Sequence, residues 1–213
     1  MGREFLSLFD HWAESYDDTV SGHDEQYKAV FRRYPAILKE ITRRAGQHVI
    51  EFGSGTGNLT AALLQADKKV FGVEPSEAMK KEALQKGIPN VFHDGDFLSF
   101  PAPPFEPDTI VSSYAFHHLT DEEKKQAIHS YGNILPSGGK IVFADTMFQN
   151  QAAHQAATNK AKAAGFDQLA EDLETEYYPS IGVLKQSFEE EGFSTSFHQM
   201  NDFVWIVEAK KRK

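Results

Sequence analysis

Apolar residues occur along this chain in short runs, and between the runs they recur at the spacing of one helix face. The runs predict buried strands at residues 49–52, 69–74, 90–93, 108–113 and 141–145. The periodic segments between them predict helices at residues 59–66, 76–86 and 121–135. Because strands and helices alternate, we expect neighbouring strands to be parallel and joined by right-handed crossovers.

The two ends of the chain depart from this alternation. Near the start, apolar spacing predicts helices at residues 5–12 and 27–44, and Pro35 is expected to bend or split the second. Beyond the fifth strand the sequence predicts two helices divided by residues 165–167, then a helix at 183–191 and a strand hairpin at 194–199 and 202–209.

Three glycines spaced by two residues follow the first strand directly. Gly53, Gly55 and Gly57 stand between that strand and a helix start, where positive φ and a bare backbone suit a bound ligand. A plain turn is the alternative, but this context favours a binding loop. A dinucleotide fingerprint would need its third glycine at position 58, where the chain has Asn58.

Two acidic residues follow later strands at the same predicted edge of the sheet. Glu74 ends the second strand, where a carboxylate can accept hydrogen bonds from both hydroxyls of a ribose. Its alternative role is to cap the helix that begins near Ser76. Asp96 and Phe97 follow the third strand and could supply an acceptor for an exocyclic amine and an apolar lid for a flat ring, or form an ordinary Asp-Gly turn.

With Glu51 included, the glycine segment has the pattern E-x-G-x-G-x-G, which resembles motif I of the class I S-adenosylmethionine-dependent methyltransferases. The resemblance implies that the backbone from Gly53 through Ser54 to Gly55 holds the methionine end of that cofactor, with Glu51 near its amino group. Residues 9–17 look like the F-D-x-x-A-x-x-Y-D segment before motif I, which implies that Tyr16 lies near the cofactor carboxylate. Simple packing of Tyr16 is the alternative.

The resemblance extends to later segments. Asp96 and Phe97 match the family element that contacts and covers adenine, and the expected cofactor contacts also include Gly57, Glu74 and Ser112. No N-P-P-Y or D-P-P-Y sequence follows the fourth strand, so the usual mark of methyl transfer to a base or amide nitrogen is missing from the sequence.

Residues 114–119 resemble the segment at which the methyl group is delivered, and His117 and His118 are the candidate catalytic residues. A histidine suits general-base chemistry near neutral pH, although these two could instead begin a helix and contact backbone. Adjacent residues do not share a helix face, so we expect at most one of them to face the pocket. No third ligand stands at a characteristic spacing, and we predict no metal site.

The resemblance covers residues 9–210 and implies a single domain with a Rossmann-like α/β fold. The expected architecture is a doubly wound seven-stranded sheet in the order 3-2-1-4-5-7-6, with the last strand antiparallel. Within residues 1–213 we expect a helical cap (1–45), a cofactor-binding core (46–146), a helical substrate cover (147–182) and a final helix and hairpin (183–213). Phe148, Tyr177 and Tyr178 are candidate substrate contacts, and a peripheral helical hairpin is the alternative.

The composition limits the kinds of partner and chemistry that we expect for this protein. The chain has 213 residues, 40% of them hydrophobic, with a net charge of −9 and no cysteine, so nucleic acid, disulfides and thiolate chemistry are not expected. It contains no run of ~18 apolar residues, and we expect a cytoplasmic protein that does not enter a membrane. The resemblance implies S-adenosyl-L-methionine as cofactor and in-line methyl transfer to a small molecule. A non-catalytic cofactor-binding protein and a nicotinamide-dependent oxidoreductase are the alternatives.

Overall fold

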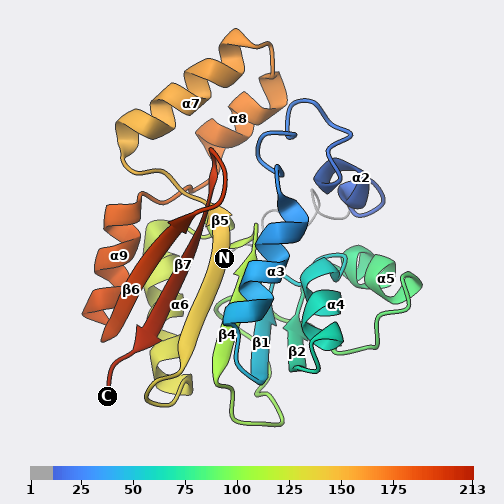
Figure 1. Ribbon diagram of the computed structural model, residues 1–213, viewed down its shortest axis with the longest axis vertical. Helices are drawn as coiled ribbons and strands as arrows, with labels where there is room; N and C mark the ends of the chain where they lie inside the picture. Colours follow the sequence, from blue (N-terminus) through green and yellow to red (C-terminus); the bar gives the residue numbers. More distant parts are fainter. Residues whose placement is uncertain (1–11) are drawn as a thin grey trace.

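The computed structural model describes residues 12–213 (Figure 1). The predicted helix at residues 5–12 and the first part of the 9–17 segment therefore fall outside the described residues, apart from Trp12. From Trp12 onward the chain forms an α/β structure around a central sheet, with helices on its two faces.

The sheet contains seven strands in the order β3-β2-β1-β4-β5-β7-β6. The strands are β1 (His48–Phe52), β2 (Lys69–Val73), β3 (Phe92–His93), β4 (Thr109–Ser113), β5 (Lys140–Thr146), β6 (Phe193–Gln199) and β7 (Val204–Lys211). The strands from β1 to β5 pair in parallel, and β7 lies antiparallel between β5 and β6. This arrangement confirms the predicted fold class, strand order and antiparallel last strand.

Most predicted helices are present with ends that differ by one or two residues. The helices are α2 (Tyr16–Val20), α3 (Tyr34–Arg44), α4 (Asn58–Gln65), α5 (Glu77–Gln85), α6 (Asp121–Ile134), α7 (Gln151–Ala163), α8 (Asp167–Thr175) and α9 (Ile181–Glu190). A short 3-10 helix, η2 (Phe116–His118), follows β4. Thr120 and Glu123 form a capping box at the start of α6.

The predicted helix at residues 27–44 is wrong in its first part. Helix α3 begins at Tyr34, and Pro35 stands in its first turn, where a missing N–H and a fixed φ are tolerated. Arg33 precedes it with a left-handed φ of 70°. Pro35 therefore marks the start of this helix and causes no bend.

Each face of the sheet has its own apolar core. Val49 of β1 packs into the cluster that contains the buried side chains of α3 and α4, whereas Ile50 and Phe52 pack into the cluster under α6 and α9. This alternation follows the two-residue period of a strand. Because both faces are covered, the central strands are buried nearly throughout.

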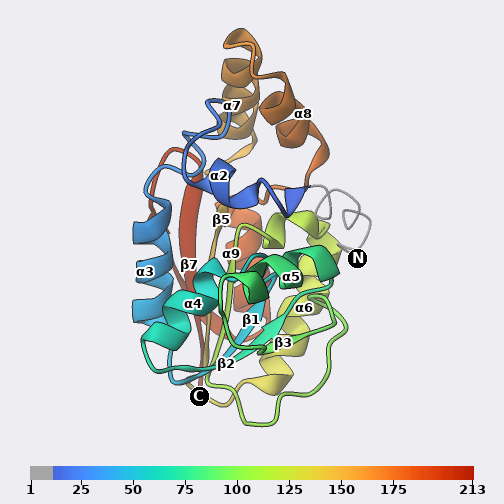
Figure 2. The same ribbon diagram turned by 90° about the vertical axis from the view of Figure 1, so that its right-hand side faces the viewer.

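The carboxyl ends of the parallel strands meet at one end of the molecule. Helices α2, α7 and α8 stand beyond this end, in the two views of Figures 1 and 2. In doubly wound sheets ligands bind at this edge, because the loops that leave the strands diverge there. Within residues 12–213 no helix is long and apolar enough to cross a membrane.

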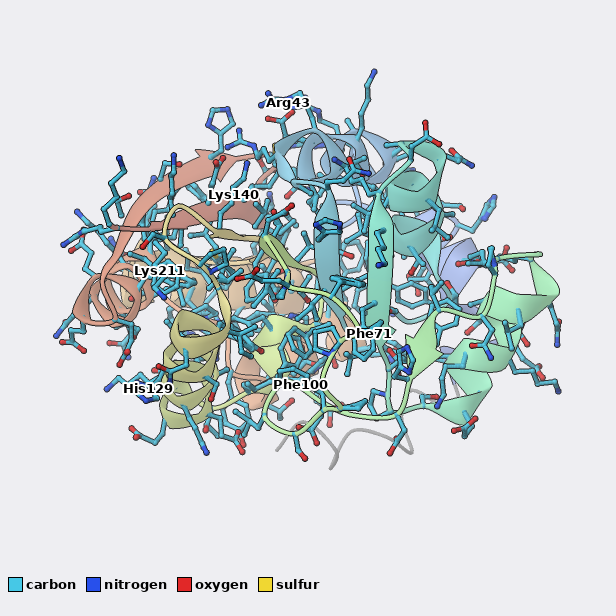
Figure 3. The ribbon with its side chains drawn as sticks, turned by 90° about the horizontal axis from the view of Figure 1, so that it is seen from below. Arg43, Phe71, Phe100, His129, Lys140 and Lys211 are labelled. Carbon is cyan, nitrogen blue, oxygen red and sulfur yellow. The ribbon has the colours of Figure 1, made fainter. Side chains whose placement is uncertain are left out.

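Lysine side chains bind backbone carbonyls at the opposite end of the sheet (Figure 3). The Lys211 Nζ donates to the carbonyls of Gly132 and Leu135 at 2.6 and 2.7 Å, and Lys140 donates to the carbonyl of Arg44. These carbonyls belong to the last turns of α6 and α3, which a cation satisfies well. The lysine contacts at this end of the sheet therefore stabilise helix ends, and the pocket lies at the other end of the sheet.

Candidate functional site

A pocket lies at the carboxyl ends of β1, β2 and β4. Residues from the turn after β1, the end of β2, the loop after β3, η2, α2, α8 and the segment after α8 line it. The space between them measures about 1170 Å³, a volume that includes the open mouth. Its position at the carboxyl ends of the strands is where ligands bind in doubly wound sheets.

The three glycines after β1 have different roles in the structure. All have positive φ, at 64° for Gly53, 54° for Gly55 and 80° for Gly57. A Cβ on Gly53 would lie 2.6 Å from the Ala115 Cβ, and one on Gly57 would lie 2.5 Å from the Ile88 Cδ1. A Cβ on Gly55 would meet no described atom closer than 4.0 Å. Gly57 thus allows close packing, whereas Gly55 presents bare backbone to the pocket.

Glu74 lies in the pocket wall beside this loop, and its side chain is nearly buried at 4% exposure. One carboxylate oxygen accepts from the Gly55 N–H at 2.8 Å, and the other accepts from the Ser76 N–H at 2.9 Å. Ser76 itself caps α5 through its hydroxyl. The carboxylate therefore connects the glycine loop to the end of β2 and also lines the pocket.

Asp96 and Phe97 line the pocket at the loop after β3. Asp96 Oδ1 accepts from the N–H groups of Leu98 and Ser99 at 2.9 Å, so the ordinary turn considered from the sequence is present. The Phe97 ring stacks on Phe52 at 5.3 Å between centroids. The turn and the pocket wall are thus made by the same pair of residues.

Four predicted cofactor contacts lie outside the pocket lining formed by residues 12–213: Glu51, Ser54, Gly57 and Ser112. Glu51 is 1% exposed and accepts from the Thr60 hydroxyl at 2.6 Å. Burial, with a smaller effect of the nearby Glu74 charge, raises the pKa of Glu51 to about 8.

Ser112, in β4, is fully buried. Among the described residues its Oγ finds no hydrogen-bond partner, and its neighbour Ser113 lines the pocket instead. Side chains on a strand alternate between the two faces, and the cofactor contact expected of Ser112 stays a prediction.

The α2 segment is fastened to the glycine loop by Asp17. One oxygen of its carboxylate accepts from the Thr56 hydroxyl at 2.8 Å and from the Asn58 amide at 2.9 Å. Lys86 donates to the other oxygen at 2.6 Å. Burial opposes ionisation of Asp17, but these donors outweigh it and lower its pKa.

Tyr16, next in the chain to Asp17, lines the pocket and packs edge-on against Phe31 at 6.4 Å. Burial raises the pKa of Tyr16 well above its usual range, and Tyr34 and Tyr114 contribute further. Tyr16 therefore stays neutral at physiological pH. Tyr16 thus lines the pocket and also packs against Phe31, and its predicted contact with the cofactor carboxylate stays a prediction.

His117 is held in place by Asp145, near the end of β5. Its Nδ1 lies 2.5 Å from Asp145 Oδ1, and its backbone N–H donates to Oδ2 at 3.0 Å. The Thr146 N–H donates to Oδ1 at 2.7 Å, which fixes the carboxylate in turn. Burial lowers the pKa of His117, but the charges of Asp145 and Glu176 outweigh it, so the net shift is upward.

The imidazoles of His117 and His118 both line the pocket, so the expectation that at most one would face it is wrong. The residues lie in a 3-10 helix, and their ring centroids are 4.1 Å apart. Glu176 approaches each ring, with Oε2 at 3.4 Å from His117 Nε2 and Oε1 at 3.6 Å from His118 Nδ1. Burial, and next the His117 charge, lower the pKa of His118 well below its usual range.

The segment that carries Glu176 is tied to η2 by backbone and lysine contacts. The Tyr177 N–H donates to the His117 carbonyl at 3.1 Å. Lys124, 2% exposed, donates to the carbonyls of Leu119 and, at 2.6 Å, Tyr177. Burial lowers the pKa of Lys124 to about 8. This anchoring fixes Glu176 beside the two histidines.

Of the three aromatic candidates for substrate contact, Tyr178 lines the pocket. Its hydroxyl donates to Glu176, and its ring stacks on His117 at 4.9 Å. Tyr177 is 41% exposed, and Phe148 is buried against His154 at 4.5 Å between centroids. Neither of these two belongs to the lining formed by residues 12–213.

Sequence reasoning missed the carboxylates at this end of the pocket. Asp145 lies behind His117, while Asp172 and Glu176 line the pocket from α8 and the segment after it. Tyr27 donates to Asp172, whose pKa burial raises to about 6. These residues lie far from His117 in the sequence, and no local motif marks them. The spacing of the histidines alone could not indicate their neighbours.

Comparison with known proteins gives a consistent result. The model of a family described as a methyltransferase domain matches residues 49–139. An uncharacterized methyltransferase of Bacillus pumilus is 89% identical over 213 residues, and the alignment covers 100% of each chain. An uncharacterized methyltransferase of Bacillus subtilis is 61% identical over 214 residues and also covers 100% of each chain.

Solved structures with lower identity share the fold. The magnesium protoporphyrin IX methyltransferase of Synechocystis, solved with bound SAM, has a TM-score of 0.69 at 17% identity and covers 99% of this chain and 97% of its own. A DhpI–SAM–HEP complex has a TM-score of 0.70 at 21% identity, with 96% and 94% covered. At these identities the likeness concerns the fold alone.

Proposed function

The chain belongs to the class I S-adenosylmethionine-dependent methyltransferases, and we propose that its pocket directs methyl transfer to a small-molecule acceptor. The observation that carries this proposal is one continuous pocket lined by Gly55, Glu74 and Asp96 at one part and by His117 and His118 at another. The first group forms the cofactor part of the pocket, and the two histidines belong to the acceptor part. Both parts open into the same space, as a direct transfer between two bound molecules requires.

The cofactor supplies an activated methyl group on a sulfonium, so the protein needs no covalent nucleophile. What the chain's own residues contribute is alignment and the exclusion of water. Trp12, Tyr16, Phe31 and Tyr178 give the pocket apolar walls, and α2 and α8 supply lining residues on its outer side. Such walls favour a compact acceptor over a macromolecule.

We assign the cofactor part to residues around the glycine loop. Gly55, whose missing Cβ leaves open space, would let the methionine end approach the backbone. Glu74, which lines the pocket at the end of β2, would accept from the ribose hydroxyls. Asp96 and Phe97 would receive the adenine amine and ring. These assignments fit a site whose polar groups are few and fixed.

We propose that Glu51 acts indirectly, by orienting residues that contact the cofactor. Its carboxyl lies behind the loop and accepts from Thr60 of α4, so it orients the loop and the helix start beside the methionine end. Ser54, Gly57 and Ser112 would likewise support the shape of the site from beneath, while Tyr16 would close it from α2.

The same division extends to the domain. Residues 46–146 would form the cofactor-binding core, and residues 147–182, with the cap from the N-terminal part, would cover the acceptor. The contacts of Glu176 and Tyr178 with His117 support this division, because they bring the cover onto the end of β4. Residues 183–213 would complete the sheet and leave the pocket to the other segments.

A transfer assay tests the proposal. The full-length protein is incubated with S-adenosylmethionine labelled in its methyl group and with fractions of small bacterial metabolites, and both labelled product and S-adenosylhomocysteine are measured. We expect the two to appear together in fractions that hold an acceptor, and Glu74→Ala to reduce both. Glu77→Ala is the matched control, because the Glu77 side chain is 85% exposed on α5. Cofactor binding without any transfer across the fractions would overturn the catalytic role.

A further inference from the structure

Two histidines and a glutamate converge on one point in the acceptor part of the pocket, and we propose that they bind a divalent metal ion. One ligand atom each from His117, His118 and Glu176 lies within 4.8 Å of the other two. The two histidines come from η2, and the glutamate comes from the segment after α8. Two imidazoles and one carboxylate form a ligand set typical of Zn²⁺.

The spacing suits a tetrahedral ion. Zn²⁺ bonds to nitrogen and oxygen at about 2.0–2.2 Å, so two ligand atoms in a tetrahedral site lie about 3.3 Å apart. Glu176 Oε2 and His117 Nε2 are 3.4 Å apart, and Glu176 Oε1 and His118 Nδ1 are 3.6 Å apart. Both separations exceed the 2.7–2.9 Å or so of a charge-assisted hydrogen bond. Small rotations of the side chains would complete the site.

The residues behind these ligands have the form of a metal site. Asp145 fixes the Nδ1 side of His117 at 2.5 Å and leaves Nε2 directed toward Glu176. A carboxylate behind a ligating imidazole selects the tautomer and strengthens the ligand. Tyr178 donates to Glu176 and would orient its carboxylate in the same way. The site therefore has both ligands and orienting partners.

The site is also held in place and mostly buried. The side chains of the three ligands are 9% exposed or less. The Tyr177 N–H donates to the His117 carbonyl and so holds the segment beside Glu176 against η2. Lys124 donates to carbonyls on both segments. Low exposure and fixed ligands favour a bound ion, because little conformational freedom is lost on binding.

Three protein ligands leave a fourth position, and the ligands line the pocket. This further step rests on the proposed function: the open position would take an ionisable O–H or S–H group of the acceptor. The ion would lower the pKa of that group, and its proton would leave to solvent. The resulting anion forms a bond to the methyl carbon while the carbon–sulfur bond of the sulfonium breaks, and that electron pair stays on sulfur.

Titration calorimetry with ZnCl₂ tests the binding site on the full-length protein after removal of metal by a chelator and dialysis. We expect one site on the wild type, and at least about tenfold weaker binding for Glu176→Gln and for His118→Asn. Asp145→Asn should weaken binding by about 10–100-fold although Asp145 is not a ligand. Circular dichroism and S-adenosylmethionine affinity measured on each variant show that the fold is kept.

His129→Ala is the matched control. His129 lies on α6 (Figure 3), and its Nδ1 is 2.9 Å from Glu191 Oε2. The two side chains form a surface histidine–carboxylate pair away from the pocket. Its loss should leave Zn²⁺ affinity unchanged. Equal affinity in wild type and Glu176→Gln, or loss of the heat signal in His129→Ala, would overturn the metal site.

The two proposals can fail separately. Zn²⁺ binding that depends on Glu176, without methyl transfer to any acceptor, would support the metal site and contradict the proposed function. Methyl transfer that persists at full rate in chelated protein, with no Zn²⁺ binding by calorimetry, would support the function and overturn the metal site. If both hold, we expect transfer to fall at least about tenfold on chelation and to recover with Zn²⁺.

Discussion

The carboxylate of Asp17 accepts a hydrogen bond from the Thr56 hydroxyl at 2.8 Å and thereby joins α2 to the glycine loop across 39 residues of sequence. Asn58 and Lys86 donate to the same carboxylate. The segment that contributes Tyr16 to the pocket is therefore attached directly to the loop that contributes Gly55. Asp17 therefore holds α2 against the glycine loop.

Asp17→Ala should weaken S-adenosylmethionine binding by about fivefold to tenfold, because α2 would lose its attachment to the loop; this corresponds to about 1–1.4 kcal/mol. The free energy of unfolding should fall by about 1–2 kcal/mol, since Thr56 and Asn58 lose their acceptor. Calorimetry and urea unfolding measure the two effects. Asp18→Ala is the control, because the Asp18 side chain is 81% exposed. Equal cofactor affinity in both variants would contradict this role for Asp17.

The buried carboxyl of Glu51 should make stability depend on pH. Its pKa is raised to about 8 in the folded protein, so the folded state retains a proton that the unfolded state loses above a pKa of about 4.3. Its contribution to stability is therefore full below about pH 4 and is lost as pH rises through about 8, with a slope of at most about 1.4 kcal/mol per pH unit.

Glu51→Gln should remove this dependence and make the protein more stable than the wild type above about pH 8, because the amide carries no proton to lose. Urea unfolding at several pH values from about 5 to 9 measures the slope. Glu122→Gln, at an exposed position of α6, should leave the wild-type slope unchanged. A wild-type slope that survives in Glu51→Gln would contradict the assignment.

The glycine loop allows packing and ligand access to be separated by mutation. Gly55→Ala and Gly57→Ala both place a side chain at positive φ, which costs about 1 kcal/mol. At Gly57 the new Cβ would also meet Ile88 at 2.5 Å, so we expect a further loss of about 1–3 kcal/mol in the free energy of unfolding. At Gly55 the Cβ enters open space in the pocket, so cofactor affinity should fall at least about tenfold with little further loss of stability.

Gly165→Ala controls for the backbone strain alone. It has a φ of 71°, and a Cβ there would meet no described atom within 4 Å. Its loss of stability should equal that of Gly55→Ala, with unchanged cofactor affinity. Chemical unfolding and calorimetry on the three variants compare the effects. If Gly55→Ala bound the cofactor as well as Gly165→Ala does, the ligand would not contact this part of the loop.

The sequence was enough to predict the parts of the site that follow directly from strand order. Gly55, Glu74 and Asp96 each come just after a strand of the parallel part of the sheet, and strand order brings those ends together. The sequence did not indicate which neighbouring side chains reach the pocket: Glu51 and Ser112 are buried and lie outside the lining that residues 12–213 form, because strand order does not decide which face of the sheet a given side chain takes.

The acceptor part could not be predicted in the same way. His117 was identified from its local segment, but Asp145 and Glu176 reach it from β5 and from beyond α8. The contact of Glu176 depends on how α7 and α8 fold back over the sheet, and on the Lys124 contacts that hold the segment down. Such tertiary contacts leave no periodic pattern in the sequence. The start of α3 at Tyr34 was missed for a local reason, because Pro35 was taken as a bend.

The most direct test of the central claim is titration calorimetry of S-adenosylmethionine into the wild type, Glu74→Ala and Glu77→Ala. If the cofactor occupies the pocket beside Gly55, loss of the Glu74 carboxylate should weaken binding at least about tenfold, since a charge-assisted pair of hydrogen bonds contributes about 1.5–3 kcal/mol. Glu77→Ala should bind like the wild type. Affinity within about twofold of the wild type for Glu74→Ala, a difference of about 0.4 kcal/mol, would contradict the account.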